Sequence, residues 1–79
     1  MYRDPVSSTS LRSVGYNEEQ QILELEFVYG GVYQYLDVPL EEYVALMSAD
    51  SKGSYFTHNI RGLYEYRDAD EKKDAIQIK

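Results

Sequence analysis

The chain has 79 residues, no cysteine and a formal net charge of −6 at pH 7. Its length indicates one small domain, and the lack of cysteine excludes a disulfide framework and a thiolate metal site. Because acidic residues outnumber basic ones fourteen to eight, a broad basic face for duplex nucleic acid is disfavoured. Much of the buried area must come from the nine tyrosines and two phenylalanines.

Residues 1–5 are predicted to be a flexible lead-in to a single domain at residues 6–66, since Pro5 favours extended or turn backbone before it. This polar start lacks the apolar stretch of a signal peptide, and no segment approaches the roughly 20 apolar residues that cross a bilayer. Together with the lack of cysteine, this indicates a cytoplasmic protein without a membrane partner.

A first strand is predicted just before the polar connection at residues 17–21. Leu11 and Val14 are three positions apart, so strict alternation fails between them. Either Ser13 marks a β-bulge or the strand starts only near Arg12.

Alternation is clearest at residues 23–28, where Leu23, Leu25 and Phe27 are separated by Glu24 and Glu26. A strand with this pattern has one face in the core and the other in water.

The adjacent glycines Gly30 and Gly31 predict a two-residue hairpin turn, because such turns need residues that accept a positive φ. The next strand, residues 32–36, should then pair antiparallel with the preceding one. Tyr33 and Tyr35 share a face of it, and the pattern leaves open whether that face is core or surface.

A helix is predicted after Pro39, a residue that suits the first turn of a helix. Ser51 is expected to cap a second short helix that runs to about residue 61, with Phe56 and Ile60 on its buried side, and ends at Gly62. The apolar stripe of the first helix, expected to lie on the sheet, has the spacing i, i+3, i+4, i+7 and consists of Leu40, Tyr43, Val44 and Met47.

Residues 63–66 alternate and suit a fourth, edge strand or an extended segment, and residues 67–79 suit a charged, flexible tail. The elements together predict an α+β fold. We expect a three- or four-stranded antiparallel β-meander packed against one main α-helix plus a second short helix.

Two groups of residues are candidates for ligand binding. Outward-facing Tyr33 and Tyr35 would offer nucleobases an aromatic platform, whereas inward-facing rings would be core. Residues 51–62 place hydroxyls, an amide and two cations near a helix N-terminus, where backbone N–H groups favour an anion. The alternative is that Ser51 and Asn59 only cap and turn the chain and that Arg61 pairs with a carboxylate. The full candidate set is Arg12, Tyr33, Tyr35, Ser51, Lys52, Tyr55, Asn59 and Arg61.

The sequence offers no recognisable catalytic arrangement. His58 is the only histidine, which excludes a multi-histidine metal site, and no nucleophile, base and orienting group form a known motif. Glu24 and Glu26 would lie roughly 7 Å apart along a strand, close enough for a glycosidase pair or a cation clamp. Both are expected on the open face as solvated carboxylates, so we predict no metal, no cofactor and no enzyme.

Several spaced blocks of residues carry a resemblance to a known family. The blocks are Val6-Ser7-Ser8, Leu11, Val14-Gly15-Tyr16, Leu23-Glu24-Leu25-Glu26-Phe27, Gly31-Val32-Tyr33-Gln34-Tyr35, Val38-Pro39, Ser51-Lys52-Gly53 and Ile60-Arg61-Gly62. Together they resemble the KTSC domain, named for its occurrence at the C-terminus of some lysyl-tRNA synthetases. The resemblance implies a small α+β domain, often a stand-alone bacterial or phage protein, with Tyr33-Gln34-Tyr35 at its centre. RNA binding has been proposed for the family because of the synthetase fusion. Thr57 stands where the family often has asparagine.

We therefore expect a non-catalytic binding module that recognises RNA or a nucleotide-like ligand. The alternative is a protein-interaction or self-assembly domain, which would use the open sheet face or residues 63–66 to bind a protein partner or form a homo-oligomer. Tyr33 and Tyr35 facing outward beside Arg61 would indicate a stacking site. The same rings beneath the helix would indicate packing, with binding around residues 51–61 instead.

Overall fold

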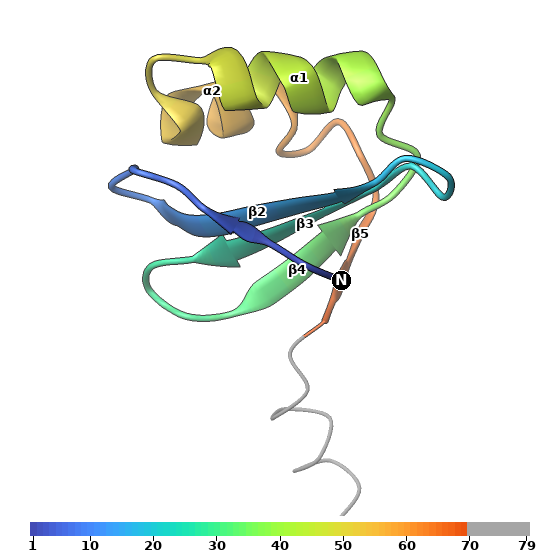
Figure 1. The fold of residues 1–79 in the computed structure, drawn as a ribbon, viewed down its shortest axis with the longest axis horizontal. Helices are drawn as coiled ribbons and strands as arrows, with labels where there is room; N and C mark the ends of the chain where they lie inside the picture. The colour runs from blue at the N-terminus through green and yellow to red at the C-terminus, as the bar shows by residue number, and fades with distance from the viewer. Residues whose placement is uncertain (70–79) are drawn as a thin grey trace, which may run out of the picture.

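The computed structural model describes residues 1–69, and its strands form one antiparallel sheet in the order β1-β2-β3-β4-β5. Both helices cover the same face of this sheet (Figure 1). The elements are β1 Asp4–Pro5, β2 Leu11–Asn17, β3 Ile22–Phe27, β4 Val32–Tyr35, α1 Leu40–Ser48, α2 Lys52–Asn59 and β5 Tyr66–Asp68. The predicted α+β meander is confirmed, with five strands in the described residues in place of three or four.

The inner face of the sheet, which faces the helices, follows from the strand register. The register between β2 and β3 shifts between Leu11 and Ser13, so the predicted irregularity is present. The extra residue brings Leu11 and Val14, three apart, onto the same buried face, where neither side chain is exposed. The core consists of Leu11, Val14, Leu23, Leu25, Phe27, Tyr35, Val38, Leu46, Phe56 and Ile60.

The connection between β3 and β4 is longer than predicted. Gly30 and Gly31 both have the expected positive φ, at 111° and 96°. However, residues 28–31 all lie between the two strands, and the Phe27 N–H donates to the Gly31 carbonyl at 3.1 Å. The turn is therefore a four-residue connection, because the glycines follow two residues that already leave the ladder.

The buried side of α1 differs from the predicted stripe. Leu46 is completely buried, whereas Leu40 and Val44 are 39% and 51% exposed. Tyr43 does face inward and stacks on Tyr16 of β2, with ring centroids 4.8 Å apart. The helix is rotated because it packs against α2 as well as the sheet.

The ends of α2 follow the prediction more closely. Ser51 caps the helix, and its hydroxyl accepts a hydrogen bond from the Ser54 N–H at 3.2 Å. Phe56 and Ile60 are buried as expected. The helix ends at Asn59, two residues before the predicted end, and Gly62 follows with a φ of 79°.

The last strand lies further along the chain than predicted. A turn in which the Leu63 N–H donates to the Ile60 carbonyl at 3.0 Å occupies the start of residues 63–66. Strand β5 begins only at Tyr66, and its Arg67 pairs with Gln34 of β4. Residues 67 and 68 of the expected tail are therefore strand, and residues 70–79 of that tail lie outside the described residues.

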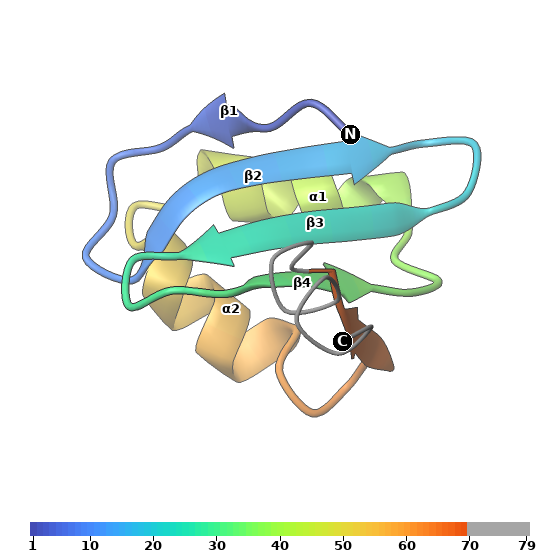
Figure 2. The same cartoon turned by 90° about the horizontal axis from the view of Figure 1, so that it is seen from below.

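The lead-in expected at residues 1–5 contains a strand. Asp4 and Pro5 form β1, which pairs with Val14 and Ser13 of β2 (Figure 2). A side chain at Gly15 would clash with the Tyr2 carbonyl, so residues 1–3 lie directly against β2 at this glycine. Within residues 1–69, no helix is long and apolar enough to cross a membrane.

The outer face of the sheet carries a row of hydrogen-bonded polar side chains, and Glu24 is only 5% exposed. The prediction of a solvated Glu24 was therefore wrong. Arg3 bonds the Glu24 carboxylate and also donates to the Ser13 hydroxyl at 2.9 Å. Gln34 donates to Glu24 at 2.8 Å and accepts from Arg67 at 2.8 Å. These partners, one of them from the N-terminal segment, replace the water that alternation alone predicts.

Candidate ligand pocket

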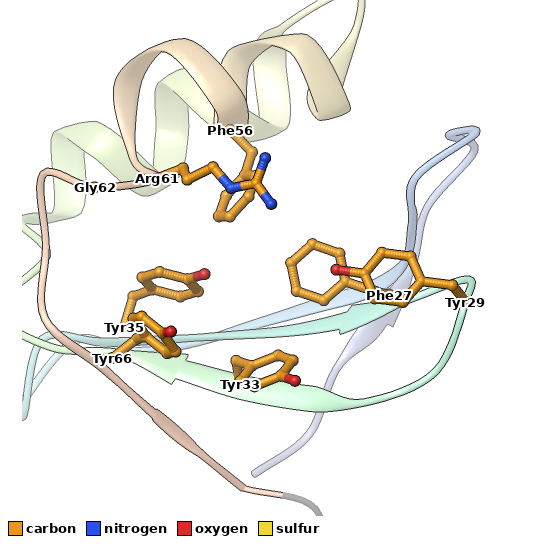
Figure 3. Close-up of a pocket in the computed structure, with 8 residues that line it drawn as sticks. All are labelled: Phe27, Tyr29, Tyr33, Tyr35, Phe56, Arg61, Gly62 and Tyr66. Atoms are coloured by element: carbon orange, nitrogen blue, oxygen red, sulfur yellow. The ribbon is translucent and has the colours of Figure 1, made fainter.

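A cavity of about 360 Å³ opens between the inner sheet face and the segment that follows α2 (Figure 3). Aromatic rings from β3, β4, α2 and β5, and one from the connection between β3 and β4, surround it. Its lining residues are Phe27, Tyr29, Tyr33, Tyr35, Phe56, Arg61, Gly62 and Tyr66.

Strand register places the two tyrosines of β4 on the inner face. Tyr33 lies opposite Leu25, Tyr35 lies opposite Leu23, and both leucines are fully buried on the helix side. Tyr35 is only 6% exposed and belongs to the core, whereas Tyr33 is half-buried. The sequence left open whether Tyr33 and Tyr35 face the core or a binding surface. Both rings lie under the helices, and both also line the cavity beside Arg61.

Five of the rings form a closed circuit. Phe27 contacts Phe56 edge to face at 5.4 Å between centroids and contacts Tyr33 at 5.8 Å. Tyr66 contacts Tyr33 at 5.9 Å and stacks on Tyr35 at 5.4 Å, and Tyr35 contacts Phe56 at 5.4 Å. Such offset and edge-to-face pairs hold each ring by its neighbours, which gives the cavity a preformed aromatic wall.

Two rings at the rim remain accessible. Tyr29 stacks on Phe27 at 5.2 Å and is 74% exposed, and Tyr66 is 61% exposed. A planar ligand entering the cavity would therefore meet exposed aromatic faces first.

Arg61 supplies positive charge at this cavity. Its backbone is held by hydrogen bonds from the Ile60 and Arg61 N–H groups to the Phe56 carbonyl, at 3.0 and 2.9 Å. Ile60 is completely buried, while the Arg61 side chain is exposed and reaches over the aromatic rings (Figure 3). Within residues 1–69, no carboxylate lies within 4.0 Å of its guanidinium, contrary to the alternative prediction of an ion pair.

The Tyr35 hydroxyl remains protonated at neutral pH. Burial, with a smaller contribution from the Tyr66 hydroxyl, raises the pKa of Tyr35 to about 12, and the Arg61 guanidinium opposes the increase. A protonated phenol both donates and accepts hydrogen bonds, so the cavity combines aromatic faces, hydroxyl groups and one guanidinium.

Residues 7–68 match the model of the KTSC domain family. The chain belongs to this family. It is similar to a KTSC domain protein of Yersinia pestis of known crystal structure, with a TM-score of 0.85 and 40% identity over 87% of this chain and 97% of that one. An uncharacterized protein of Stutzerimonas stutzeri is 54% identical over 56 residues, covering 71% of this chain and 79% of that protein. A lysine–tRNA ligase of Nostoc sp. is 39% identical over 56 residues, but these cover only 10% of the ligase.

This KTSC domain divides the predicted candidate residues into two groups. The first group consists of Tyr33, Tyr35 and Arg61, which line the aromatic cavity. Ser51 and Lys52 line a separate cavity of about 370 Å³, together with residues 7–9 and Asp50. In that second place Ser51 acts as the helix cap, and Lys52 contacts the Ala49 carbonyl at 3.4 Å.

The remaining candidates lie away from the aromatic pocket of the KTSC domain. The Asn59 side chain donates to the Tyr55 carbonyl at 3.2 Å, which fits the turn role predicted as its alternative. Arg12 lies 3.9 Å from the Glu26 carboxylate, an outer-face residue. Tyr55 contacts Glu42 of α1 through its hydroxyl.

Sequence reasoning missed Glu42. Tyr55 and Tyr64 both donate hydrogen bonds to its carboxylate, so one acidic side chain joins α1, α2 and the segment that carries Arg61. The hydrogen bond to Glu42 raises the pKa of Tyr55 to about 12, and burial together with this carboxylate raises the pKa of Tyr64. No local pattern marks such a residue, because its partners are distant in sequence.

The pocket residues Phe27, Tyr29, Phe56 and Tyr66 were also not among the candidates. Tyr66 had a usable signal, since it alternates with Tyr64 within the segment that was predicted as an edge strand. Phe27 and Phe56 were recognised only as core residues, and Tyr29 was not singled out, because an aromatic side chain alone carries no distinct chemical signature.

Proposed function

We propose that this KTSC domain is a non-catalytic module that binds RNA or a nucleotide-like ligand in its aromatic pocket. The observation that carries this proposal is the guanidinium of Arg61, which has no carboxylate partner in residues 1–69 and lies over a ring-lined cavity. Stacking of a base on an aromatic side chain contributes about 1–3 kcal/mol. A guanidinium is well suited to a phosphate, which it can bind through two parallel hydrogen bonds.

The charge at the pocket favours an anionic ligand over a cationic one. Rings arranged around a cavity can also receive quaternary ammonium groups. Here the guanidinium of Arg61 would repel such a cation, whereas it would attract a phosphate. The hydroxyls of Tyr33, Tyr35 and Tyr66 offer hydrogen bonds to the polar edge of a base.

The relatives support an RNA-related role. Three lysine–tRNA ligases share this stretch at 34–39% identity, and by their name these proteins act on tRNA. The shared stretch is a small part of each ligase, so it is suited to an accessory binding module.

The proposal excludes catalysis, although a serine and a histidine are neighbours on α2. Ser54 and His58 lie 3.3 Å apart on the exposed face of α2. The same imidazole nitrogen lies 2.9 Å from the Ser54 carbonyl, as expected for a residue one helical turn away. No acidic side chain among the described residues orients this imidazole, so the pair lacks the third member that activates a nucleophile.

We also propose that the protein is cytoplasmic, in agreement with its lack of cysteine.

The test is a calorimetric titration of the purified protein with single-stranded RNA homopolymers and with nucleotides at low salt. Saturable binding is expected, and Arg61→Ala should weaken it while Arg67→Ala, on the opposite sheet face, should not. Absence of heat with every RNA and every nucleotide would overturn the proposal.

The second candidate function is protein interaction or self-assembly at the β5 edge. Strand β5 lies at the edge of the sheet, and its first residue, Tyr66, is 61% exposed. Leu63, three residues before it, is 69% exposed. The outer sheet face is a weaker choice, since a hydrogen-bonded polar row covers it. Sedimentation over a range of protein concentrations tests the homo-oligomeric form, and a monomer at every concentration would contradict it.

A further inference from the structure

The size of the aromatic pocket limits what can enter it. At about 360 Å³ it lies near the lower end of the roughly 300–1,000 Å³ range of small-molecule sites. The room suits one base with its sugar and phosphate. Several stacked bases would not fit within it.

The distribution of cations gives an independent limit. Residues 1–69 contain five cationic side chains, of which Arg61 lines the pocket. Arg3 and Arg12 lie against the outer-face carboxylates. Arg67 donates to Gln34, and Gln34 sits between Tyr33 and Tyr35 on β4, so it points to the opposite face.

Lys52, the fifth cation, is the first residue of α2, whereas Arg61 lies two residues beyond its last residue. This helix of 8 residues is about 12 Å long, and Lys52 lines the other cavity. An RNA strand that leaves the pocket would therefore meet no row of cationic side chains within residues 1–69 to bind its further phosphates. The net charge of −6 would repel those phosphates.

We propose that the pocket takes a single nucleotide, with one base among the aromatic rings and one phosphate on Arg61, and that it does not follow an RNA strand. This inference rests on the proposed function and specifies its ligand. A free nucleoside monophosphate and a nucleotide at the end of an RNA share the chemistry that the pocket recognises.

The salt dependence of binding follows from one phosphate contact. For single strands, log K falls against log salt with a slope of about −0.7 for each phosphate neutralised. The slope here should therefore be no steeper than about −0.7, for a mononucleotide and for an RNA of any length.

The experiment compares nucleoside 5′-monophosphates of the four bases, the matching nucleosides, and 5′-phosphorylated oligonucleotides of increasing length, at several salt concentrations. At least one monophosphate should bind at least about tenfold more tightly than its nucleoside, since a charged hydrogen-bond pair is lost without phosphate. Lengthening the RNA should leave the affinity per site unchanged. Arg61→Gln should remove the preference for the monophosphate, and the matched Arg67→Gln control should retain it, with circular dichroism confirming that both variants fold.

The possible outcomes separate this inference from the proposed function. Binding that appears only with long RNA and has a steep salt slope would overturn the single-nucleotide site while leaving RNA binding intact. Equal affinity for nucleoside and monophosphate would overturn the phosphate contact at Arg61. Absence of binding by every probe would overturn both proposals. If a monophosphate binds, displacement of it by a 5′-phosphorylated oligonucleotide assigns the site to RNA ends, and failure of displacement assigns it to free nucleotides.

Discussion

The hydroxyl of Tyr64 donates a 3.0 Å hydrogen bond to the carboxylate of Glu42, although the two residues lie on different sides of α2 in the sequence. Tyr55 donates to the same carboxylate. Because Arg61 lies in the segment between α2 and Tyr64, this bond fixes one end of the segment that presents the guanidinium. Glu42 is thus a positioning residue that does not line the pocket.

Replacing Glu42 should lower the stability of the fold. Glu42→Ala leaves two half-buried tyrosine hydroxyls without their acceptor, and we expect a loss of about 1–3 kcal/mol in the free energy of unfolding. Urea titration measures this loss. Glu41→Ala, an exposed carboxylate in the same helical turn, is the matched control and should change stability little. Equal losses of stability in the two variants would contradict the role of Glu42 as the shared acceptor of the two tyrosine hydroxyls.

The tyrosine pKa values predict loss of stability at alkaline pH. Folding raises the pKa of Tyr35 and Tyr55 from 10.0 to about 12, through burial and through the hydrogen bond to Glu42 respectively. Their contribution is complete below pH 10 and is lost as the pH rises through about 12, because the unfolded chain ionises first. The urea midpoint of unfolding, measured between pH 10 and about 12, tests this prediction. A midpoint that stays constant over this pH range would disprove the loss of stability. In Glu42→Gln, tyrosinate absorbance should show two tyrosines, Tyr55 and Tyr64, titrating at lower pH.

Arg3 should stabilise the fold by compensating the buried Glu24 carboxylate. Arg3→Met leaves this carboxylate with Gln34 as its remaining partner, and we expect a cost of about 1–3 kcal/mol in unfolding free energy. The double variant with Glu24→Gln should lose less than the sum of the single changes, since the buried charge is then gone. Arg12→Met, whose side chain is 62% exposed, should cost less than about 0.5 kcal/mol. Additive losses in the cycle would rule out this coupling.

Gly15 should be required for the N-terminal segment to lie on β2. Gly15→Ala places a Cβ against the Tyr2 carbonyl and 3.0 Å from the Arg3 Cγ, so residues 1–3 must lift away. Relief of such a clash costs about 1–3 kcal/mol. Hydrogen exchange of β1 and β2 should then increase. In a chain that lacks residues 1–3 the same substitution should have little effect, and an unchanged penalty there would show that the clash is not the cause.

The parts of the fold that follow local rules were predictable. Alternation placed Leu23, Leu25 and Phe27 on the buried face, and the hydroxyl of Ser51 identified the start of α2. The side of the sheet occupied by Tyr33 was not predictable, because a tyrosine suits either face. Its position depends on the pairing with Leu25, which is a property of two strands together.

The errors have a common physical origin in contacts between distant segments. Glu24 was expected in water because its partner Arg3 comes from residues that looked like a lead-in. The predicted buried stripe of α1 was wrong because α1 also packs against α2, a contact that no helical pattern reveals. Arg61 was identified as a candidate, yet only the fold showed that it joins Tyr33 and Tyr35 at one cavity.

The pairing of β5 with β4 also determines how the pocket forms and opens. It brings Tyr66 beside Tyr35 and closes the longest chain loop between neighbouring strands, which is the costliest contact in chain entropy. Strand β5 has three residues, all exposed, so it should detach by local unfolding while β1 to β4 stay paired. Detachment would remove Tyr66 from the ring circuit. Ligand binding should accordingly be seen as slower amide exchange in β5, because the bound molecule would favour the docked strand.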